Sequence, residues 1–340
     1  MPNQTIYILS IESSCDDTSI AVLKNQTVLS NVVASQKVHQ NYGGVVPELA
    51  SRAHQQNIIP VMHQALKEAK IEKTHISAIA FTRGPGLMGS LLVGTSFAKS
   101  LAMALEIPLI EVNHMQAHLL AHFIDDAGQE IPSFPFLGIT ISGGHTQIVK
   151  VTHHFELEVI GETLDDAIGE AFDKGGKMLG LSYPAGPQID KLAKLGNPKS
   201  FDFPIPNVKE LNFSFSGLKT ALLYFIQKSQ KENPNFIEEN LADICASYQY
   251  TIVKILTNKI KKAVKQTGIR EIAIGGGVSA NREIRETLQQ LALKHHWKVH
   301  IPKFEYTTDN AAMIGIVGYY KYLEKDFCGL DVTPKARFGF

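Results

Sequence analysis

The sequence contains little cysteine and carries no net charge. Its three cysteines, Cys15, Cys245 and Cys328, are far apart and form no CxxC pair. This count argues against a disulfide scaffold or a zinc ribbon and favours a reducing compartment. Lysine plus arginine and aspartate plus glutamate both number 33, so the formal net charge is zero. The protein is therefore not expected to hold nucleic acid by bulk positive charge. The balanced charge does not rule out a local basic patch.

Uninterrupted hydrophobic runs of membrane length are also missing. Residues 1–10 have no basic stretch before their apolar run, which argues against a signal peptide. The most apolar region, residues 91–110, is interrupted by Lys99 and Glu106, a pattern typical of a buried helix followed by a strand. We therefore expect a soluble, cytoplasmic protein with no membrane partner.

What the sequence does contain is an alternation of strand and helix patterns. A buried strand over residues 76–81 precedes a helix from about residue 89, and a strand over 109–112 precedes another helix. Hydrophobic residues make up 44% of the 340 residues, enough for a large core. The alternation predicts an α/β fold with largely parallel sheets.

One opening pattern occurs twice. Strand, small-polar turn and strand cover residues 6–23, and the same order returns over residues 136–151. This repeat predicts two related lobes around a nucleotide-binding cleft. The polar segment 125–133 is the predicted boundary. It divides the chain into an N-terminal lobe, a C-terminal lobe with helical insertions and a tail, over residues 1–125, 134–325 and 326–340.

Glycine-rich turns are the first candidates for ligand binding. The turn Ser142–Thr146 exposes backbone N–H groups that a phosphate can approach. The segment Gly275–Asn281 follows a strand and opens a helix, an arrangement that binds anions or nucleotides. Its spacing matches neither GxGxxG nor the P-loop. Taken alone, a turn such as Ser142–Thr146 is more often a simple turn than a phosphate site, whereas for Gly275–Asn281 a tight turn is an equal alternative.

His114 and His118 are the candidate metal ligands. Their spacing of four residues places both imidazoles on one face of a helix, as in many metal sites. The glutamate of HExxH is missing, and so is the base of a zincin protease. Asp309 is the candidate third ligand, although it could serve only as a helix N-cap. Two histidines and a carboxylate suit Fe(II) or zinc.

Three further segments have structural alternatives that weigh at least as heavily as a functional role. The predicted helix 164–179 carries a polar stripe, which is usually a solvated face but could meet hydroxyl groups of a substrate. The segment 212–220 interleaves aromatics with hydroxyls, a pattern that fits a buried core better than base stacking. The lysines near the end of the predicted helix 237–266 favour solubility over an RNA footprint.

Taken in order, these segments resemble the bacterial TsaD family, the tRNA N6-adenosine threonylcarbamoyltransferases of the actin/hexokinase/Hsp70-like (ASKHA) superfamily. The resemblance covers essentially the whole chain. The matching stretches are Ile11–Thr18, Gly43–Arg52, Arg83–Ser90, His114–His118, Ser142–Gln147, Gly161–Lys174, Asn212–Thr220, Gly275–Asn281 and Thr307–Gly315.

The resemblance implies an ASKHA fold and a set of site residues. It implies one divalent metal per subunit, most commonly iron, held by His114, His118 and Asp309. The residues that it implies for the nucleotide or adenylate substrate are Thr140, Ile141, Ser142, Gly143, Gly144, Asp173, Gly186, Asp190 and Asn281. Glu12, on the first turn, is a candidate base or water-positioning residue.

The resemblance also implies a reaction and partners. The L-threonylcarbamoyl group of threonylcarbamoyl-AMP would move to N6 of adenosine 37, in tRNAs that read codons beginning with A. The expected partners are tRNA, a TsaB-like paralogue and a TsaE-like ATPase. Three alternatives stay open: a metal-dependent peptidase, a small-molecule kinase or carbamoyltransferase on the same fold, and a scaffold subunit without catalysis.

Overall fold

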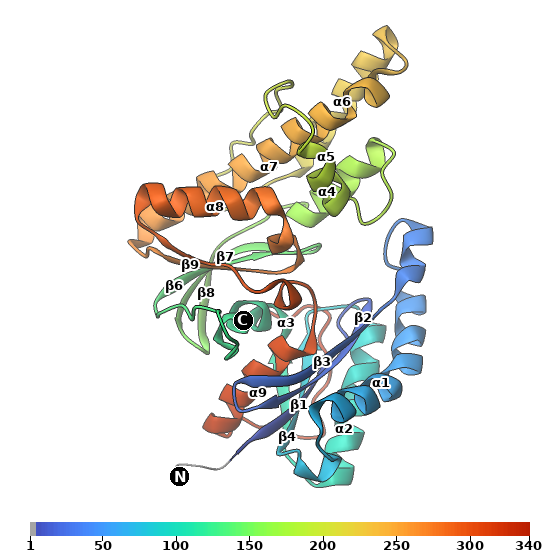
Figure 1. Cartoon of the computed structure of the whole chain (residues 1–340), viewed down its shortest axis with the longest axis vertical. Coiled ribbons are helices and arrows are strands. Elements are labelled where there is room, and N and C mark those ends of the chain that lie inside the picture. The colour runs from blue at the N-terminus through green and yellow to red at the C-terminus, as the bar shows by residue number, and fades with distance from the viewer. Residues whose placement is uncertain (1–4) are drawn as a thin grey trace. The chain divides into compact units, whose positions relative to one another are not determined.

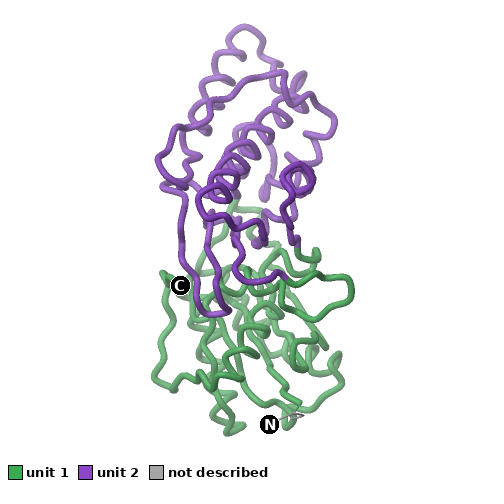
Figure 2. Tube along the Cα trace, turned by 90° about the vertical axis from the view of Figure 1, so that its left-hand side faces the viewer, with its two compact units in different colours: residues 1–131, 302–340 green, residues 132–301 purple. Residues whose placement is uncertain are grey.

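The computed structural model describes residues 5–340, which form two compact units (Figure 2). Unit 1 contains the residues up to Ile131 together with Pro302–Phe340, and unit 2 contains Pro132–Ile301. The chain therefore leaves unit 1, builds unit 2 and returns to complete unit 1.

The core of unit 1 is a five-stranded sheet with the order β3-β2-β1-β4-β5 (Figure 1). Its strands are β1 (Tyr7–Glu12), β2 (Asp17–Lys24), β3 (Thr27–Ser35), β4 (Ala78–Gly84) and β5 (Leu109–Asn113). Its helices are α1 (Pro47–Ala69), α2 (Met88–Leu105), α3 (His114–Leu120) and α9 (Ala311–Glu324). Short 3-10 segments lie at Lys37–Tyr42, Lys73–His75, Ala121–Phe123 and Phe304–Tyr306.

Side chains of the unit 1 strands alternate between two covered faces. Leu9 and Phe81 belong to a hydrophobic cluster with residues of α1 and α2. Their neighbours in sequence point to the opposite face, where α9 packs on β1 and β4. Gly318 permits this close approach, because a Cβ at that position would lie 2.5 Å from Cβ of Ala80. A sheet covered on both faces explains why its strands are almost continuously apolar.

Unit 2 contains a second five-stranded sheet, with the order β10-β9-β6-β7-β8. Its strands are β6 (Phe136–Ile141), β7 (Thr146–His153), β8 (Glu156–Glu162), β9 (Glu271–Gly275) and β10 (Lys298–His300). Its helices are α4 (Ile168–Met178), α5 (Gly186–Ala193), α6 (Ser216–Glu232), α7 (Phe236–Thr267) and α8 (Arg282–His295), with a 3-10 segment, η4, at Gly277–Ala280. Residues from the sheet and from all five helices share one hydrophobic core.

The two sheets have the same topology. Each sheet contains a meander of three antiparallel strands, β1-β2-β3 or β6-β7-β8. Two strands that pair in parallel, β4-β5 or β9-β10, extend the sheet beside the first strand of the meander. This confirms the duplication inferred from the repeated opening. The prediction of largely parallel sheets was wrong, because the turns 13–16 and 142–145 are short and can join only antiparallel strands.

The predicted lobe boundaries differ from the observed units. Residues 302–325, which we assigned to the second lobe, lie in unit 1 because α9 packs on β1, β2, β4 and β5. The tail 326–340 belongs to unit 1 as well, where Cys328 N donates to Leu109 O at 2.9 Å. Sequence order could not show this return of the chain.

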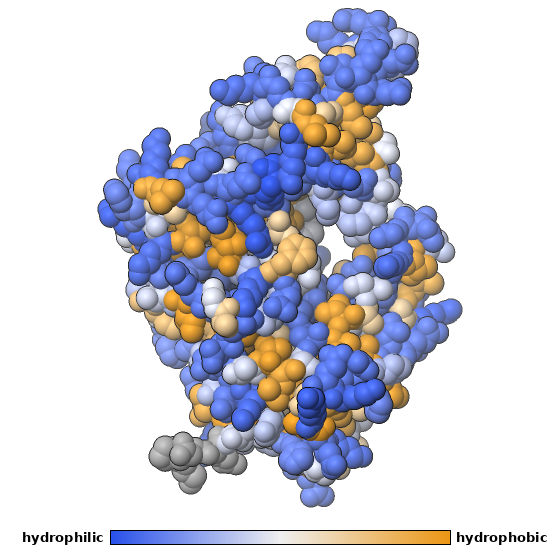
Figure 3. Space-filling model, in the orientation of Figure 1, coloured by the Kyte–Doolittle hydropathy of each residue, from blue (hydrophilic) through white to orange (hydrophobic). Residues whose placement is uncertain are grey.

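Hydrophobic residues lie on the surface of the protein as well as in its cores. In Figure 3, hydrophilic residues cover most of the visible face, with scattered apolar patches between them. Among the described residues, α2 is the one helix that has the length and composition to cross a membrane. A third of its residues are buried. Helix α2 packs on α1 and β4 with its buried residues, whereas Met88, Leu92 and Met103 are exposed.

Candidate functional site

His114 and His118 are presented by the short helix α3, which follows β5 directly. Asn113 caps this helix, and its Oδ1 accepts hydrogen bonds from Met115 N at 2.8 Å and Gln116 N at 3.2 Å. One helical turn separates the two imidazoles, whose ring centroids lie 4.7 Å apart in an edge-on arrangement. His114 is 7% exposed and His118 1%. The predicted shared face is confirmed.

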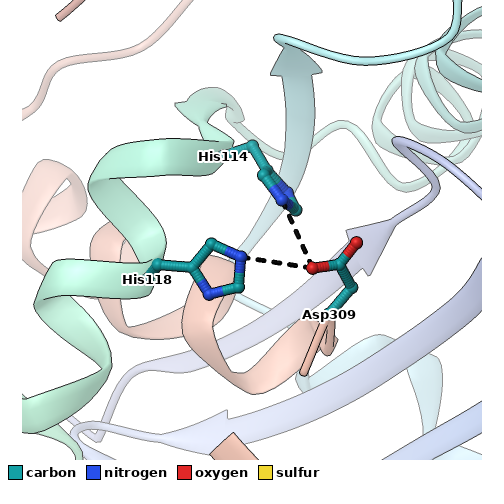
Figure 4. Close-up of side chains that lie close together, drawn as sticks. All are labelled: His114, His118 and Asp309. Atoms are coloured by element: carbon teal, nitrogen blue, oxygen red, sulfur yellow. Dashed lines mark ion pairs between the residues drawn. The ribbon is translucent and has the colours of Figure 1, made fainter. Parts of the chain in front are cut away.

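Asp309 meets both histidines from the loop before α9 (Figure 4). Its Oδ1 lies 3.4 Å from Nε2 of His114 and 3.2 Å from Nε2 of His118. The alternative role of Asp309 as the N-cap of α9 is excluded, because Asn310 fills it by accepting from Met313 N at 3.1 Å. Asp309 is thus left to face the histidines.

Glu12 lies behind His114, at the end of β1. Its side chain is 1% exposed, and its Oε2 lies 3.0 Å from Nδ1 of His114. The same carboxylate accepts from Ser14 N at 2.5 Å and from Thr82 Oγ1 at 2.6 Å. Because an ionised carboxylate can only accept hydrogen bonds, Nδ1 of His114 is the donor to Glu12 and its Nε2 is directed to Asp309. The contacts therefore suit positioning of His114 better than proton abstraction from a substrate.

The charges in this cluster stabilise one another. Burial acts to raise the pKa of Glu12, but the adjacent His114 outweighs burial and lowers it. Burial likewise opposes a charged Asp309, and His114 together with His118 holds the pKa of Asp309 well below its usual range. For His114, burial lowers the pKa, whereas Glu12 and Asp309 raise it well above the ordinary value.

The residues of this cluster fit a divalent transition metal. One ligand atom from each of His114, His118 and Asp309 lies within 4.8 Å of the others. Nδ1 of buried His118 makes no hydrogen bond, and its Nε2 has only the contact with Oδ1 of Asp309 at 3.2 Å, so neither nitrogen has the hydrogen-bond partner that burial normally demands. Two imidazoles and a carboxylate are a usual ligand set for Fe(II) or zinc.

In unit 2, the predicted phosphate turn joins β6 to β7. Gly143 and Gly144 are exposed, and a Cβ on either would meet nothing within 4 Å. Ser142 fixes the turn: its N donates to His145 O at 2.8 Å, and its Oγ accepts from His145 N at 3.1 Å. Thr140, at the end of β6, is fully buried and its Oγ1 has no hydrogen-bond partner.

The other residues predicted for the nucleotide are connected to this turn by contacts within unit 2. Gly169 N, in the first turn of α4, donates to Ser142 O at 3.2 Å. Further along α4, Asp173 Oδ1 accepts from Ala185 N at 2.8 Å, directly before Gly186. Burial raises the pKa of Asp173, although the bonds from Ala185 and Gly186 oppose this. The turn, α4 and the start of α5 therefore form one neighbourhood.

Asp190 and Asn281 complete that neighbourhood through a residue that sequence reasoning missed. Nε2 of Gln249, on α7, donates to Asp190 Oδ1 at 3.1 Å, and its Oε1 accepts from Asn281 Nδ2 at 2.9 Å. The loop that leads to Asn281 returns to the turn, because Gly276 packs against the backbone of Ile141. No local signal marked Gln249, which is one of several amide side chains along a long helix.

The remaining motifs have structural roles. Phe213 and Phe215 are fully buried, so the aromatic pattern belongs to the core. Lys259 and Lys262 both donate to Glu210 O, at 2.9 and 3.0 Å, so part of the lysine cluster anchors a loop. The predicted helix 164–179 begins only at Ile168, which leaves the Asp166 end of the polar stripe in the preceding turn.

Solved structures establish the class of fold. HypF in its phosphate- and nucleotide-bound form superposes with a TM-score of 0.63 at 14% identity, over 95% of this chain and 47% of that chain. Component A of the (R)-2-hydroxyglutaryl-CoA dehydratase of Acidaminococcus fermentans gives 0.53 at 13% identity, over 94% and 99%. The ASKHA-type fold predicted from the sequence is confirmed.

Sequence comparison establishes the family within that class. Residues 27–316 match the family described as TsaD, tRNA N6-adenosine threonylcarbamoyltransferase. The enzyme of that name from Christiangramia forsetii is 68% identical over 340 residues, which is 100% of both chains. The one from Porphyromonas gingivalis is 58% identical over 334 residues, or 98% of each chain. The chain belongs to the TsaD family.

Proposed function

We propose that this protein is a tRNA N6-adenosine threonylcarbamoyltransferase that moves the L-threonylcarbamoyl group from threonylcarbamoyl-AMP to N6 of adenosine 37. The tRNA substrates are those that read codons beginning with A. The observation that carries this proposal is the match to enzymes of that name along the whole chain. The convergence of His114, His118 and Asp309 supports it.

The reaction is an acyl transfer. The N6 amine of adenosine attacks the carbamoyl carbon, the bond from that carbon to the phosphate oxygen breaks, AMP leaves, and N6 loses a proton to solvent or to a base. The donor is already activated as a mixed anhydride. The protein must therefore orient the amine, hold the phosphate and stabilise negative charge on the carbonyl or the leaving group.

Residues of unit 2 are assigned to the nucleotide portion of the donor. The exposed glycines of the turn 142–145 would leave room for a phosphate beside backbone N–H groups. Asp190 would accept hydrogen bonds from hydroxyl groups, and Asn281 would use the amide hydrogen that Gln249 leaves free. These roles are consistent with the contacts that gather the segments around one another.

Residues of unit 1 are assigned to a divalent metal, iron or zinc. His114, His118 and Asp309 would hold it and Glu12 would fix the ring of His114. A metal with three protein ligands supplies Lewis-acid polarisation of a substrate oxygen when it is bound. Nε2 of His118 lies 3.2 Å from Oδ1 of Asp309, a separation that is consistent with two ligands of one ion.

We further propose that the protein acts in the cytoplasm with partners. The formal charge of zero leaves the affinity for tRNA to local patches and to other subunits. A TsaB-like paralogue and a TsaE-like ATPase are the partners proposed. Nothing in the site favours a peptidase, because the helix that carries His114 and His118 has no glutamate between them.

Reconstitution tests the proposal. Threonine, bicarbonate, ATP, an adenylate-forming enzyme, the partner proteins and tRNA are combined with and without this chain, and the tRNA nucleosides are analysed. The modified adenosine is expected only when the chain is present. Its equal formation in both mixtures, or transfer of phosphate from ATP to a small molecule, would contradict the proposal.

Variants of the histidines connect the reaction to the site. H114A/H118A is expected to lose zinc binding and product formation while it keeps the circular dichroism spectrum of the parent. H63A/H295A is the matched control, because both of these histidines are exposed and lie outside α3. Full product formation by a metal-free H114A/H118A variant would overturn the role of the cluster.

A further inference from the structure

Three helices of unit 2 meet at the side chain of Gln249, which is 2% exposed. It projects from α7 between Asp190, on α5, and Asn281, which caps α8. Nε2 of Gln249 lies 3.1 Å from Asp190 Oδ1, and its Oε1 lies 2.9 Å from Asn281 Nδ2. The carboxamide of Gln249 thus contacts both Asp190 and Asn281, the two residues that the proposed function assigns to nucleotide binding.

The direction of each hydrogen bond is fixed by the chemistry of the partners. Ionised Asp190 can only accept, so it must face the NH2 group of Gln249. Oδ1 of Asn281 already accepts from Ile284 N at 3.0 Å, so the NH2 group of Asn281 faces Oε1 of Gln249. The orientations of both amides are therefore determined by the network itself.

The same network limits the hydrogen bonds that Asp190 and Asn281 can make with a ligand. Asp190 Oδ2 lies 3.4 Å from Arg282 N, which leaves each carboxylate oxygen with capacity for a further hydrogen bond. Asn281 retains one amide hydrogen, because Gln249 uses the other. Both side chains are half-buried, so neither is sealed off from a ligand.

We infer that Gln249 is a positioning residue for the nucleotide site, and that its carboxamide holds Asp190 and Asn281 in the orientations that bind the adenylate. The inference rests on the proposed function of those two residues. A side chain here must donate to a carboxylate and accept from an amide in a buried place. Glutamate cannot donate when it is ionised, and methionine of similar length can do neither.

Variants of Gln249 test this role, with AMP as the probe. We expect Q249E and Q249M to raise the Kd for AMP about tenfold in titration calorimetry, the effect of losing one productive hydrogen bond. Q266E is the matched control, because Gln266 is an exposed glutamine on the same helix. Its Kd should equal that of the parent.

A second measurement separates positioning from stability. Thermal unfolding of each variant is followed by the fluorescence of Trp297, the one tryptophan of the chain, which packs against the core of unit 2. A merely structural Gln249 would lower the unfolding temperature and leave the Kd of the folded protein unchanged, and that result overturns the inference. A higher Kd at a temperature where the variant is fully folded supports it.

The outcomes also separate this inference from the proposed function. If the parent protein binds no AMP, the nucleotide site itself fails, and the positioning role fails with it. If the parent binds AMP and both variants bind it equally well, only the role of Gln249 is overturned. If Q249E and Q249M lose affinity and Q266E does not, the inference is supported.

Discussion

Glu12 and His114 are 102 residues apart in sequence, yet Oε2 of Glu12 lies 3.0 Å from Nδ1 of His114 in the interior of unit 1. Glu12 is at the end of β1 and His114 is at the start of α3. The parallel register of β1 with β4 and of β4 with β5 brings these two strand ends together. The pairing fixes which nitrogen of His114 is directed to Asp309.

The first prediction concerns this pair. E12Q removes the charge that orients His114, so the zinc affinity of the protein should fall by about 10- to 100-fold. Titration calorimetry with zinc measures this, and circular dichroism checks the fold. If zinc affinity stays at the parent value while product formation is lost, Glu12 acts on the substrate rather than on His114.

The C-terminal tail gives the second prediction. Nδ2 of Asn113 donates to Phe338 O at 3.3 Å and to Gly339 O at 2.9 Å, while Oδ1 of Asn113 caps α3. The tail therefore secures the residue that precedes His114. Removal of residues 337–340 should weaken zinc binding about fivefold, because the amide of Asn113 loses its partners.

Two more variants test that explanation. N113S keeps an N-cap oxygen but lacks the amide, so it should weaken zinc binding to the same degree as the truncation. The combination should be no weaker than either change alone, because both remove one link. F340A, which leaves both tail carbonyls in place, is the control. Additive losses would show that the tail does not act through Asn113.

Asp165 provides a prediction about pH and the stability of unit 2. Its Oδ1 accepts from Phe215 N at 2.7 Å and its Oδ2 accepts from Ser216 Oγ at 2.7 Å, at the first turn of α6. Burial acts to raise its pKa, but the hydrogen bonds from Ser214, Ser216 and the backbone outweigh burial and lower it. Asp165 thus supplies from a distant segment the cap that α6 lacks.

The sign of the pH effect follows from the lowered pKa. The contribution of ionised Asp165 is fully present above the unfolded-state pKa of about 3.9 and is lost as the pH falls through the lower folded-state value. D165N should therefore destabilise unit 2 by about 1 kcal/mol near neutral pH. The difference from the parent should shrink on acidification below about pH 4.

Urea unfolding followed by Trp297 fluorescence measures this difference across pH. D202N is the control, because Asp202 is an exposed aspartate of the same unit. A difference between D165N and the parent that stays constant from neutral to acidic pH would contradict the proposed role of the Asp165 charge.

Gly276 gives a prediction about the loop before α8. It has a φ of +91°, and a Cβ there would lie 2.6 Å from Ile141 O. G276A should therefore destabilise unit 2 by about 1–3 kcal/mol, because alanine meets both a strained backbone and a backbone neighbour. G277A, where a Cβ would meet nothing within 4 Å, should change the unfolding free energy by less than about 0.5 kcal/mol. Equal stabilities of the two variants would refute the steric argument.

Local patterns predicted most of the elements. The strand expected over 109–112 is β5, Leu109–Asn113, and the helix expected over 237–266 is α7, Phe236–Thr267. Apolar periodicity and turn residues act within a few positions of one another, so sequence reports them directly. The sequence pattern placed the start of α4 four residues too early. The turn before Ile168 is not helical because Thr163 Oγ1 donates a hydrogen bond to Asp166 O.

The sequence by itself determined the pairing of His114 with His118, because four residues make about one helical turn whatever the surroundings. It also carried the repeat of strand, turn and strand, and the match to the TsaD family. Only the tertiary structure decided that Asp309, and not Asn310, faces the histidines. It also decided that Glu12 lies behind His114. In unit 2, it decided that Gln249 joins Asp190 to Asn281. Those contacts join residues far apart in sequence, and their geometry depends on strand register and helix packing that no local pattern encodes.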